Sequence, residues 1–188
     1  MLDAAAGDTP LASLSASTRK KLRQHRRKLD KEGAVTFTTH QGPDIGAFVD
    51  EFLAMEASGW KGRSGTALAA SGATAQFTRA ALGGLGEAGD ASLMTLRLDG
   101  VPLAAQIILR CGAAAFTWKT AYDETWASVS PGMLLFEACT QTFTDDPALN
   151  FVDSCCYDDS GYMASGWTAR RSVARLMLDA RPGRSVRL

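Results

Sequence analysis

The sequence predicts an α+β fold built on a mixed β-sheet, and three observations lead to this prediction. Apolar residues alternate with polar ones along three consecutive segments between residues 92 and 121, which is the period of half-buried strands. The pair Asp99-Gly100 between the first two segments is typical of a tight hairpin turn, so these strands should form an antiparallel meander. A helix that begins at Pro131 then leads to a short strand at residues 150–153, and such a crossover between parallel strands is almost always right-handed.

Length and composition point to one globular domain. The chain has 188 residues with an apolar fraction of 46%, and we expect residues 1–16 to be a loose, flexible tail and residues 17–188 to be the domain. Twenty basic and twenty acidic side chains cancel, so the chain as a whole does not have the charge of a nucleic-acid-binding protein. Its four cysteines have no zinc-ligand spacing, and we interpret them as reduced thiols of a cytoplasmic protein. We expect no membrane-spanning segment and no secretory signal, because no apolar run reaches 18 residues and the N-terminus lacks the signal pattern.

The elements before the meander alternate between helix and strand. A first helix is expected over residues 17–31, where Leu22 and Leu29 give a thin apolar stripe and Gly33 ends the pattern. A short strand should follow at residues 34–39. Two more helices should pack on the sheet, one from Pro43 and Asp44 onward and one over residues 74–85, with a loop at residues 59–65 between them. Their apolar positions recur at helical spacing: Phe48, Val49, Phe52, Leu53 and Met55 in one, and Phe77, Ala81, Leu82 and Leu85 in the other.

The second half of the chain completes the sheet. The meander strands are expected at residues 92–98, 103–110 and 114–121, and the crossover helix at residues 131–143. A polar, aromatic loop should occupy residues 154–166. A last strand is expected over residues 168–178, with two pairs of apolar side chains on opposite faces: Val173 with Met177, and Leu176 with Leu178.

The clearest functional signal is the strand–loop–helix unit over residues 116–135. The helix opens with Ser130-Pro131-Gly132; serine is a good N-cap, and proline suits the first helical position because its missing N–H would have no partner there. A helix start offers free backbone N–H groups and a positive dipole end, and both favour a phosphate. The sequence therefore predicts an anion site at the N–H groups of Gly132, Met133 and Leu134, with an ordinary capped helix as the alternative.

The order of elements over residues 17–188 resembles the GNAT acyltransferase fold. The segment Leu98-Asp99-Gly100-Val101-Pro102-Leu103-Ala104-Ala105 looks like the L-x-x-G-x-x-x-A step of many GNAT domains. Residues 118–124, 130–135 and 151–153 look like the CelD-like branch from polysaccharide and cellulose biosynthesis loci, which is related to the FemAB peptidyltransferases. In that branch Ser-Pro-Gly replaces the usual pyrophosphate loop, as it does here. The resemblance implies a three-layer, GNAT-like sheet with helices on both faces. Family members often contain two such halves, and this chain would be the C-terminal one.

The resemblance also implies an activity. The chain should be an N-acyltransferase that moves an acyl group, most simply acetyl from acetyl-CoA or another acyl-CoA, to an amine of a small molecule or a saccharide precursor. Ser130 and the Gly132 helix start would hold the pyrophosphate, and Tyr162, in the short helix expected after Asp153, would protonate the departing thiolate. Tyr157 is the weaker candidate for that role. The alternatives are a non-catalytic GNAT-like binding module and a FemAB-like transferase that uses aminoacyl-tRNA.

Polar residues near the strand ends are candidates for contacting the acceptor. Asp123 or Glu124 could take the proton of the amine, directly or through water, or both could belong to a solvated loop. Lys119 and Tyr122 are candidate substrate contacts. Lys119 could pair with Asp123 or Glu124, face an anionic substrate, or simply belong to the solvated face of the sheet. Asp153 could contact substrate or hold its own loop by accepting backbone N–H bonds.

A basic segment lies in the first helix. Seven of the ten residues from Arg19 to Lys28 are basic, so this helix could bind the phosphates of CoA, RNA or an anionic lipid, or be a solvated face. It has no interleaved aromatic residues, which argues against base stacking. We expect His25 and His40 to be surface residues and predict no metal site.

Overall fold

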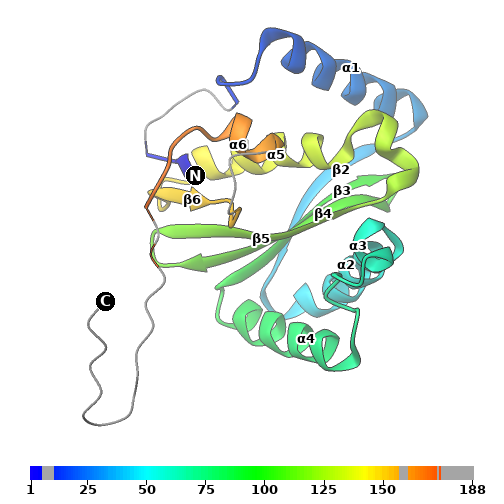
Figure 1. The fold of residues 1–188 in the computed structure, drawn as a ribbon, viewed down its shortest axis with the longest axis vertical. Helices are drawn as coiled ribbons and strands as arrows, with labels where there is room; N and C mark the ends of the chain where they lie inside the picture. Colours follow the sequence, from blue (N-terminus) through cyan, green and yellow to red (C-terminus); the bar gives the residue numbers. More distant parts are fainter. Residues whose placement is uncertain (6–10, 157–160, 173, 175–188) are drawn as a thin grey trace.

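The computed structural model describes residues 1–5, 11–156, 161–172 and 174. In this part of the chain the sheet has six strands in the order β1-β6-β5-β4-β3-β2 (Figure 1). The strands are β1 (Leu2–Asp3), β2 (Val35–Gln41), β3 (Ala91–Leu98), β4 (Val101–Cys111), β5 (Ala114–Tyr122) and β6 (Phe151–Asp153). Only the β5–β6 pair is parallel among these strands, and the meander of β3, β4 and β5 is antiparallel. The predicted mixed sheet is therefore confirmed.

Helices cover both faces of the sheet and make three layers (Figure 1). One face carries α2 and α4, and the other carries α1, α5 and α6. The helices are α1 (Ala16–Glu32), α2 (Ile45–Ser58), α3 (Trp60–Arg63), α4 (Gly72–Glu87), α5 (Pro131–Thr144) and α6 (Tyr162–Gly166), with 3₁₀ turns η1 (Gly42–Asp44) and η2 (Glu124–Val129). None of the helices in the described residues is long and apolar enough to cross a bilayer.

Each face of the sheet has its own hydrophobic cluster because strand side chains alternate between the two faces. Leu93 and Ile107 belong to the cluster under α2 and α4, whereas Leu96 and Ile108 belong to the cluster under α1 and α5. We refer to these two sides of the sheet as the α2 face and the α5 face. Burying apolar surface on both faces stabilises the sheet by roughly 25 cal/mol per Å².

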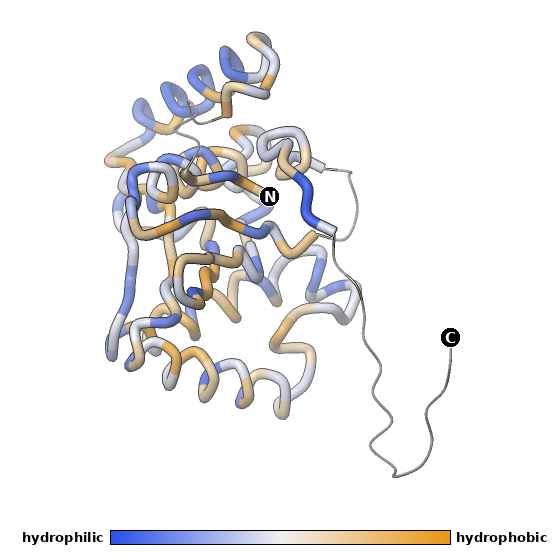
Figure 2. The backbone as a smooth tube through the Cα atoms, turned by 90° about the vertical axis from the view of Figure 1, so that its left-hand side faces the viewer, coloured by the Kyte–Doolittle hydropathy of each residue, from blue (hydrophilic) through white to orange (hydrophobic). Residues whose placement is uncertain are grey.

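The basic helix α1 begins at Ser15, whose side-chain oxygen accepts the Thr18 N–H at 3.1 Å, and it ends at Gly33. Figure 2 shows α1 as a largely hydrophilic helix, and its buried stripe consists of Leu22, His25 and Leu29. This corrects the expectation that His25 is a surface residue: its position falls on the stripe that the flanking leucines define. Burial lowers the pKa of His25, and the charges of Lys21 and Lys28 lower it further.

His40 is also not a fully exposed residue. Its ring stacks on Phe48, with 3.4 Å between ring centroids, and its Nε2 is hydrogen-bonded to Thr95 Oγ1 at 3.0 Å. Burial lowers the pKa of His40. We find no cluster of potential metal ligands among the described residues.

Helix α4 turns a different face to the sheet from the one predicted. Phe77 is 65% exposed, and the buried positions of α4 are Ala75, Thr78, Leu82 and Gly86. The reason is close packing against α2: a Cβ atom at Gly86 would lie 2.5 Å from Ile45 Cγ2. The glycine allows the two elements to approach, and the bulky Phe77 is left outside the contact.

The two ends of the chain differ from expectation. Within the predicted loose tail, Leu2 and Asp3 pair antiparallel with β6, and Leu11 and Leu14 are buried. This pairing satisfies the main-chain edge of β6 that would otherwise be open. The predicted last strand is absent over residues 168–172, which contain none of the alternating apolar residues. The side chains on which that prediction depended lie outside the described residues: Val173, Leu176, Met177 and Leu178.

Candidate functional site

A β-bulge shapes the outer half of β5. Lys119 is paired with Ile107 of β4 and Thr117 with Ile108, so Trp118 has no partner opposite it. A bulge of this kind opposes two residues to one and bends the strand. Trp118 packs against the cluster on the α2 face, and Lys119 lies opposite Ile107 of the same cluster. Trp118 and Lys119 therefore lie on the same face although they are consecutive.

The strands β5 and β6 part just before this bulge. Their parallel pairing runs from Ala114 with Phe151 to Phe116 with Asp153, where β6 ends. Beyond Phe116 this edge of β5 has no neighbouring strand in the described residues. An open strand edge presents main-chain N–H and C=O groups to a ligand.

A cleft of about 620 Å³ opens at this point. Its wall is formed by α3, the bulged part of β5, the start of α5, residues 154–156 and α6. Six predicted site residues line it: Lys119, Tyr122, Ser130, Gly132, Met133 and Tyr162. Met133 and Tyr122 pack on the α5-face cluster and Trp118 on the α2-face cluster, so the cleft reaches both faces of the sheet.

The helix start at the cleft provides fewer free donors than predicted. Ser130 adopts a left-handed conformation (φ 49°), and its carbonyl accepts the N–H groups of Met133 at 3.0 Å and Leu134 at 3.2 Å. Pro131 has no N–H. Gly132 N–H is therefore the donor of this first turn that has no acceptor among the described residues. Leu134 does not face the cleft, since its side chain is buried in the α5-face core.

Gly132 leaves room for a ligand beside the helix start. A Cβ atom at this position would meet only Tyr122 Cδ1, at the ordinary contact distance of 3.7 Å. Tyr122 thus forms the floor next to Gly132. The approach to the Gly132 N–H is open, as a phosphate-binding position requires.

Tyr162 begins α6 on the α5 face of the cleft. Its ring packs edge-on against Phe136, with 5.3 Å between centroids. Burial raises the pKa of the Tyr162 phenol, although a hydrogen bond with the Thr120 side chain lowers it in part. The phenol therefore keeps its proton at neutral pH, the state that a general acid needs. Tyr157 lies outside the described residues.

The three predicted carboxylates lie outside the cleft wall, and each holds local structure. Asp123 accepts the N–H and hydroxyl of Thr125 at 2.9 and 2.7 Å, which starts η2. Asp153 accepts the Cys155 N–H at 2.8 Å and lies 3.5 Å from Arg171 Nη2, which matches the loop-holding alternative.

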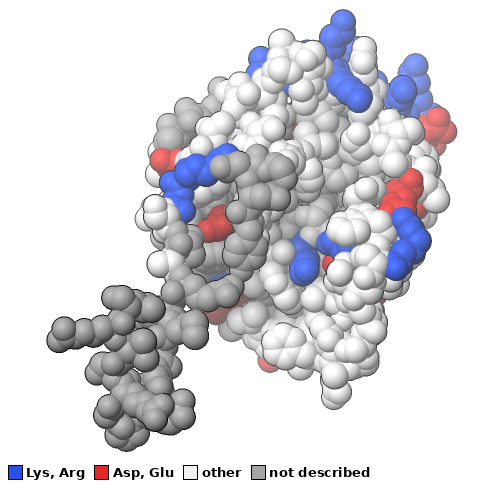
Figure 3. All heavy atoms as spheres, in the orientation of Figure 1, with Lys and Arg blue, Asp and Glu red and all other residues white. Residues whose placement is uncertain are grey.

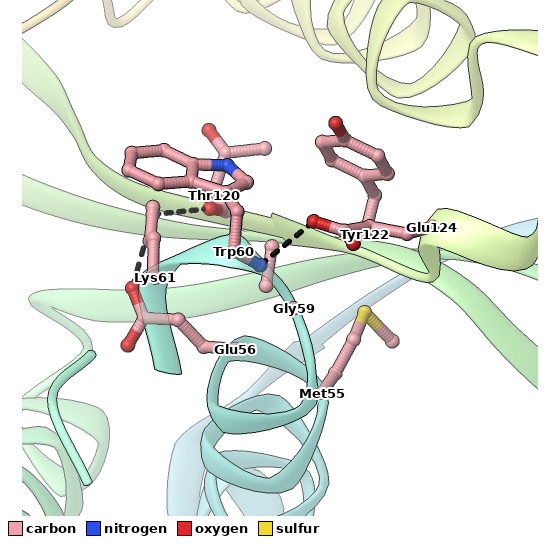
Figure 4. Close-up of a pocket in the computed structure, with 9 residues that line it drawn as sticks. Met55, Glu56, Gly59, Trp60, Lys61, Thr120, Tyr122 and Glu124 are labelled. Atoms are coloured by element: carbon pink, nitrogen blue, oxygen red, sulfur yellow. Dashed lines mark hydrogen bonds and ion pairs between the residues drawn. The ribbon is translucent and has the colours of Figure 1, made fainter. Parts of the chain in front are cut away.

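Glu124 ties the loop after β5 to α3. Its carboxylate accepts the Trp60 N–H at 2.7 Å and is paired with Arg63 Nη2 at 2.8 Å. Hydrogen bonds from Arg63 and then from the Trp60 N–H lower the pKa of Glu124. Glu124 lines a smaller pocket of about 20 Å³ beside the cleft (Figure 4), which is large enough for about one water.

Sequence reasoning missed a buried ion pair that supports the same wall (Figure 4). Lys61 Nζ lies 3.0 Å from Glu56 Oε1 and donates to the Thr120 carbonyl at 2.7 Å. Glu56 Oε2 accepts the Leu68 N–H at 2.7 Å, and the Glu56 side chain is fully buried. The available signal was a glutamate at a position that continues the apolar stripe of α2 after Val49, Phe52 and Leu53.

We expect Glu124→Gln to lower the melting temperature at pH 7, because the amide cannot accept both charge-assisted bonds. The folded-state pKa of Glu124 lies below the unfolded value near 4.5, so its contribution is present above that pH and is lost as pH falls through the folded pKa. The gap in melting temperature between parent and variant should therefore close as the pH is lowered below about 4.5. Thermal unfolding followed by circular dichroism measures this gap, with Glu87→Gln, at an exposed position, as the control. A gap that is constant from pH 7 to 3 contradicts this account.

Comparisons with known proteins agree with this architecture. A family model described as an acetyltransferase (GNAT) domain matches residues 16–162. No curated protein matches the sequence at a significant level.

Matches among the solved structures include two acetyltransferases. The structure of an aminoglycoside acetyltransferase from an uncultured soil metagenomic sample, in complex with sisomicin, is similar with a TM-score of 0.52 at 12% identity, covering 78% of this chain and 97% of that one. A ribosomal-protein-alanine N-acetyltransferase from Brucella melitensis has a TM-score of 0.49 at 13% identity, with 78% and 100% covered. At this level of identity the first of these similarities shows the fold alone.

Proposed function

This chain belongs to the GNAT acetyltransferase family, and from that membership we propose that it transfers an acyl group, most simply acetyl from acetyl-CoA, to the amine of a small molecule or saccharide. The observation that carries this proposal is the cleft at the parting of β5 and β6, with the start of α5 on its wall. The cleft brings together the start of α5, where a phosphate could bind, and the open edge of β5.

The residues around the α5 start fit the pyrophosphate of an acyl-CoA. Gly132 N–H has no acceptor in the part of the chain that the structure describes, the positive end of the 14-residue helix α5 points the same way, and Ser130 adds a hydroxyl. The open edge of β5 offers main-chain partners for the amides of a pantetheine arm. When bound, the acyl-CoA supplies an activated thioester.

Acyl transfer then requires two proton transfers, one to the departing thiolate and one from the attacking amine. Tyr162, protonated at neutral pH, gives its proton to the thiolate that departs when the amine attacks the thioester carbonyl. The amine must lose a proton, which would pass to solvent through a water that the small pocket beside Glu124 has room to hold. Its lowered pKa makes Glu124 a weak base, so it serves better to position that water than to hold the proton.

The finer assignment rests on sequence motifs. The strand, Ser-Pro-Gly and Phe-Val-Asp motifs support the CelD-like branch related to FemAB enzymes and a role in polysaccharide biosynthesis. The free thiols of the four cysteines support a cytoplasmic location. The aminoglycoside acetyltransferase with bound sisomicin supports an amine acceptor in general terms.

A second ligand surface is proposed on α1. Figure 3 shows Lys and Arg side chains gathered over this helix. Arg26 is paired with Asp30, whereas Lys20, Lys21, Arg27 and Lys28 are exposed. This charge supports binding of a phosphate-bearing ligand, including RNA if the donor were an aminoacyl-tRNA.

Turnover with acetyl-CoA tests the proposed function. Purified protein should release free CoA thiol in the presence of an amine, and saturating acetyl-CoA should raise the melting temperature. A hundredfold excess over Kd adds about 2.7 kcal/mol to the free energy of unfolding, which corresponds to roughly 5–10 °C for a chain of this size. Binding without turnover for any amine would favour the non-catalytic module, and no thermal shift at millimolar acetyl-CoA would contradict the proposed transfer and favour that module as well.

A further inference from the structure

We propose that the acceptor is an amine that carries both a ring and an anionic group, with its ring against Trp118 and its anion at the Lys119 ammonium. This inference rests on the proposed acyl transfer and names the substrate class of the same site. Its basis is the part of the cleft that opens on the α2 face of the sheet.

The cleft separates two kinds of binding surface. The α5 start with Gly132 and the phenol of Tyr162 lie on the α5 face, where the donor would enter. Trp118 and Lys119 lie on the α2 face. The parting of β5 and β6 connects the two, so a thioester that reaches through it from the α5 face meets an acceptor at Trp118 and Lys119.

Lys119 brings an uncompensated positive charge to this surface. Its ammonium makes no hydrogen bond or ion pair with any described residue, although its side chain is half-buried in the cleft wall. Lys61, which also lines the cleft, differs because Glu56 and the Thr120 carbonyl already satisfy it. A lone ammonium in a concave wall attracts an anion and repels a polycation.

Two tryptophans supply flat apolar surface beside this charge. Trp118 is half-buried on the α2-face cluster, and the bulge places it directly next to Lys119 on that face. Trp60 lines the same cleft and is 51% exposed, and its main-chain N–H donates to the Glu124 carboxylate. Exposed indole faces next to a cation suit a ring that has one apolar face and one charged substituent.

Two matched pairs of amines test this inference. Glucosamine and glucosamine 6-phosphate differ by one phosphate, and tyramine and tyrosine differ by one carboxylate. At saturating acetyl-CoA, kcat/KM should be about tenfold higher for the anionic member of at least one pair, because one charge-assisted contact in a partly exposed site is worth about that factor. The preference should shrink as salt is raised, since the pair is partly exposed. The pair that shows it distinguishes a phosphate from a carboxylate.

Variants at Lys119 connect the preference to this residue. Lys119→Gln should bring the ratio of kcat/KM within the preferred pair close to one, and Lys119→Arg should restore most of it. Arg79→Gln removes an equal charge from an exposed position of α4, which lines neither the cleft nor the α1 surface, and should leave the ratio as in the parent. Melting temperatures show whether each variant is folded.

Three results would overturn the inference: equal kcat/KM within both pairs, a preference that survives Lys119→Gln, or anionic amines that show neither turnover nor calorimetric binding at millimolar concentration. Acetyl-CoA binding, measured by calorimetry on the same protein, separates this failure from that of the proposed function. Protein that binds acetyl-CoA but shows any of the three results retains the proposed function and loses only the acceptor class.

Discussion

Tyr162→Phe is expected to lower kcat for acyl transfer about 100-fold, while KM for acetyl-CoA changes little. Loss of a positioned general acid costs roughly 10²–10⁴ in rate, and a thiolate is a comparatively good leaving group, so we expect the lower end. The ring itself should stay in place because its edge-on contact with Phe136 does not involve the hydroxyl. Steady-state release of CoA thiol measures both constants.

The pH profile provides an independent check on this role. The raised pKa of Tyr162 keeps the phenol protonated until the pH exceeds about 10, so the parent should lose activity only on that alkaline side through this group. Tyr122→Phe serves as the matched control, since it removes the neighbouring cleft hydroxyl and should cost far less in kcat. A Tyr162→Phe enzyme with the kcat of the parent would exclude proton transfer by Tyr162.

Trp167→Ala is expected to destabilise the fold by about 3–5 kcal/mol, the usual cost of deleting a buried large aromatic side chain. Trp167 is 1% exposed and packs against Phe136 and Phe143, with centroids 5.0 and 6.1 Å away. Its indole N–H donates to Thr140 Oγ1 at 3.1 Å. Truncation therefore leaves a cavity at the end of α6, the helix that carries Tyr162, and a less satisfied hydroxyl on Thr140 of α5.

Urea unfolding measures this loss of free energy of unfolding, and the melting temperature should fall by roughly 10 °C or more. Trp167→Phe, which keeps most of the packing, should lose less than half as much. Trp60→Ala removes a tryptophan that is 51% exposed and should change the free energy of unfolding by no more than about 0.5 kcal/mol. Equal midpoints for Trp167→Ala and the parent would show that α6 does not depend on this contact.

The sheet could be predicted because its signals are local. Alternation along β3, β4 and β5 and the Asp99-Gly100 turn place the meander to within one or two residues. The start of α5 at Pro131 also follows from neighbouring residues. The α4 face and His25 were misjudged because packing between distant elements decided them, through the approach of Gly86 to Ile45 in the first case.

The site could be predicted only in part for the same reason. Residues of the strand–loop–helix unit line the cleft together because they are neighbours in the sequence. Glu124 is hydrogen-bonded to Trp60 and Arg63, which lie more than 60 positions earlier in the chain. These bonds could not be inferred from the sequence of the loop alone. The bulge at Trp118 could not be predicted either, because it depends on the register of β5 against β4.

Calorimetric titration of CoA into the parent, Gly132→Ala and Gly132→Asp tests the central claim most directly, namely that the α5 start holds the pyrophosphate. Both substitutions fit sterically, since the new Cβ meets only Tyr122 Cδ1 at 3.7 Å, and a carboxylate in the first turn suits the helix dipole. All three proteins should therefore be folded with similar melting temperatures.

A carboxylate beside the pyrophosphate should nevertheless weaken binding. Like charges about 4 Å apart repel by roughly 4 kcal/mol at an effective dielectric of about 20, and screening reduces this further. We predict that Gly132→Asp raises the Kd for CoA at least about tenfold, while Gly132→Ala stays within about threefold of the parent. A Gly132→Asp protein that binds CoA as tightly as the parent would contradict the account and place the anion site elsewhere.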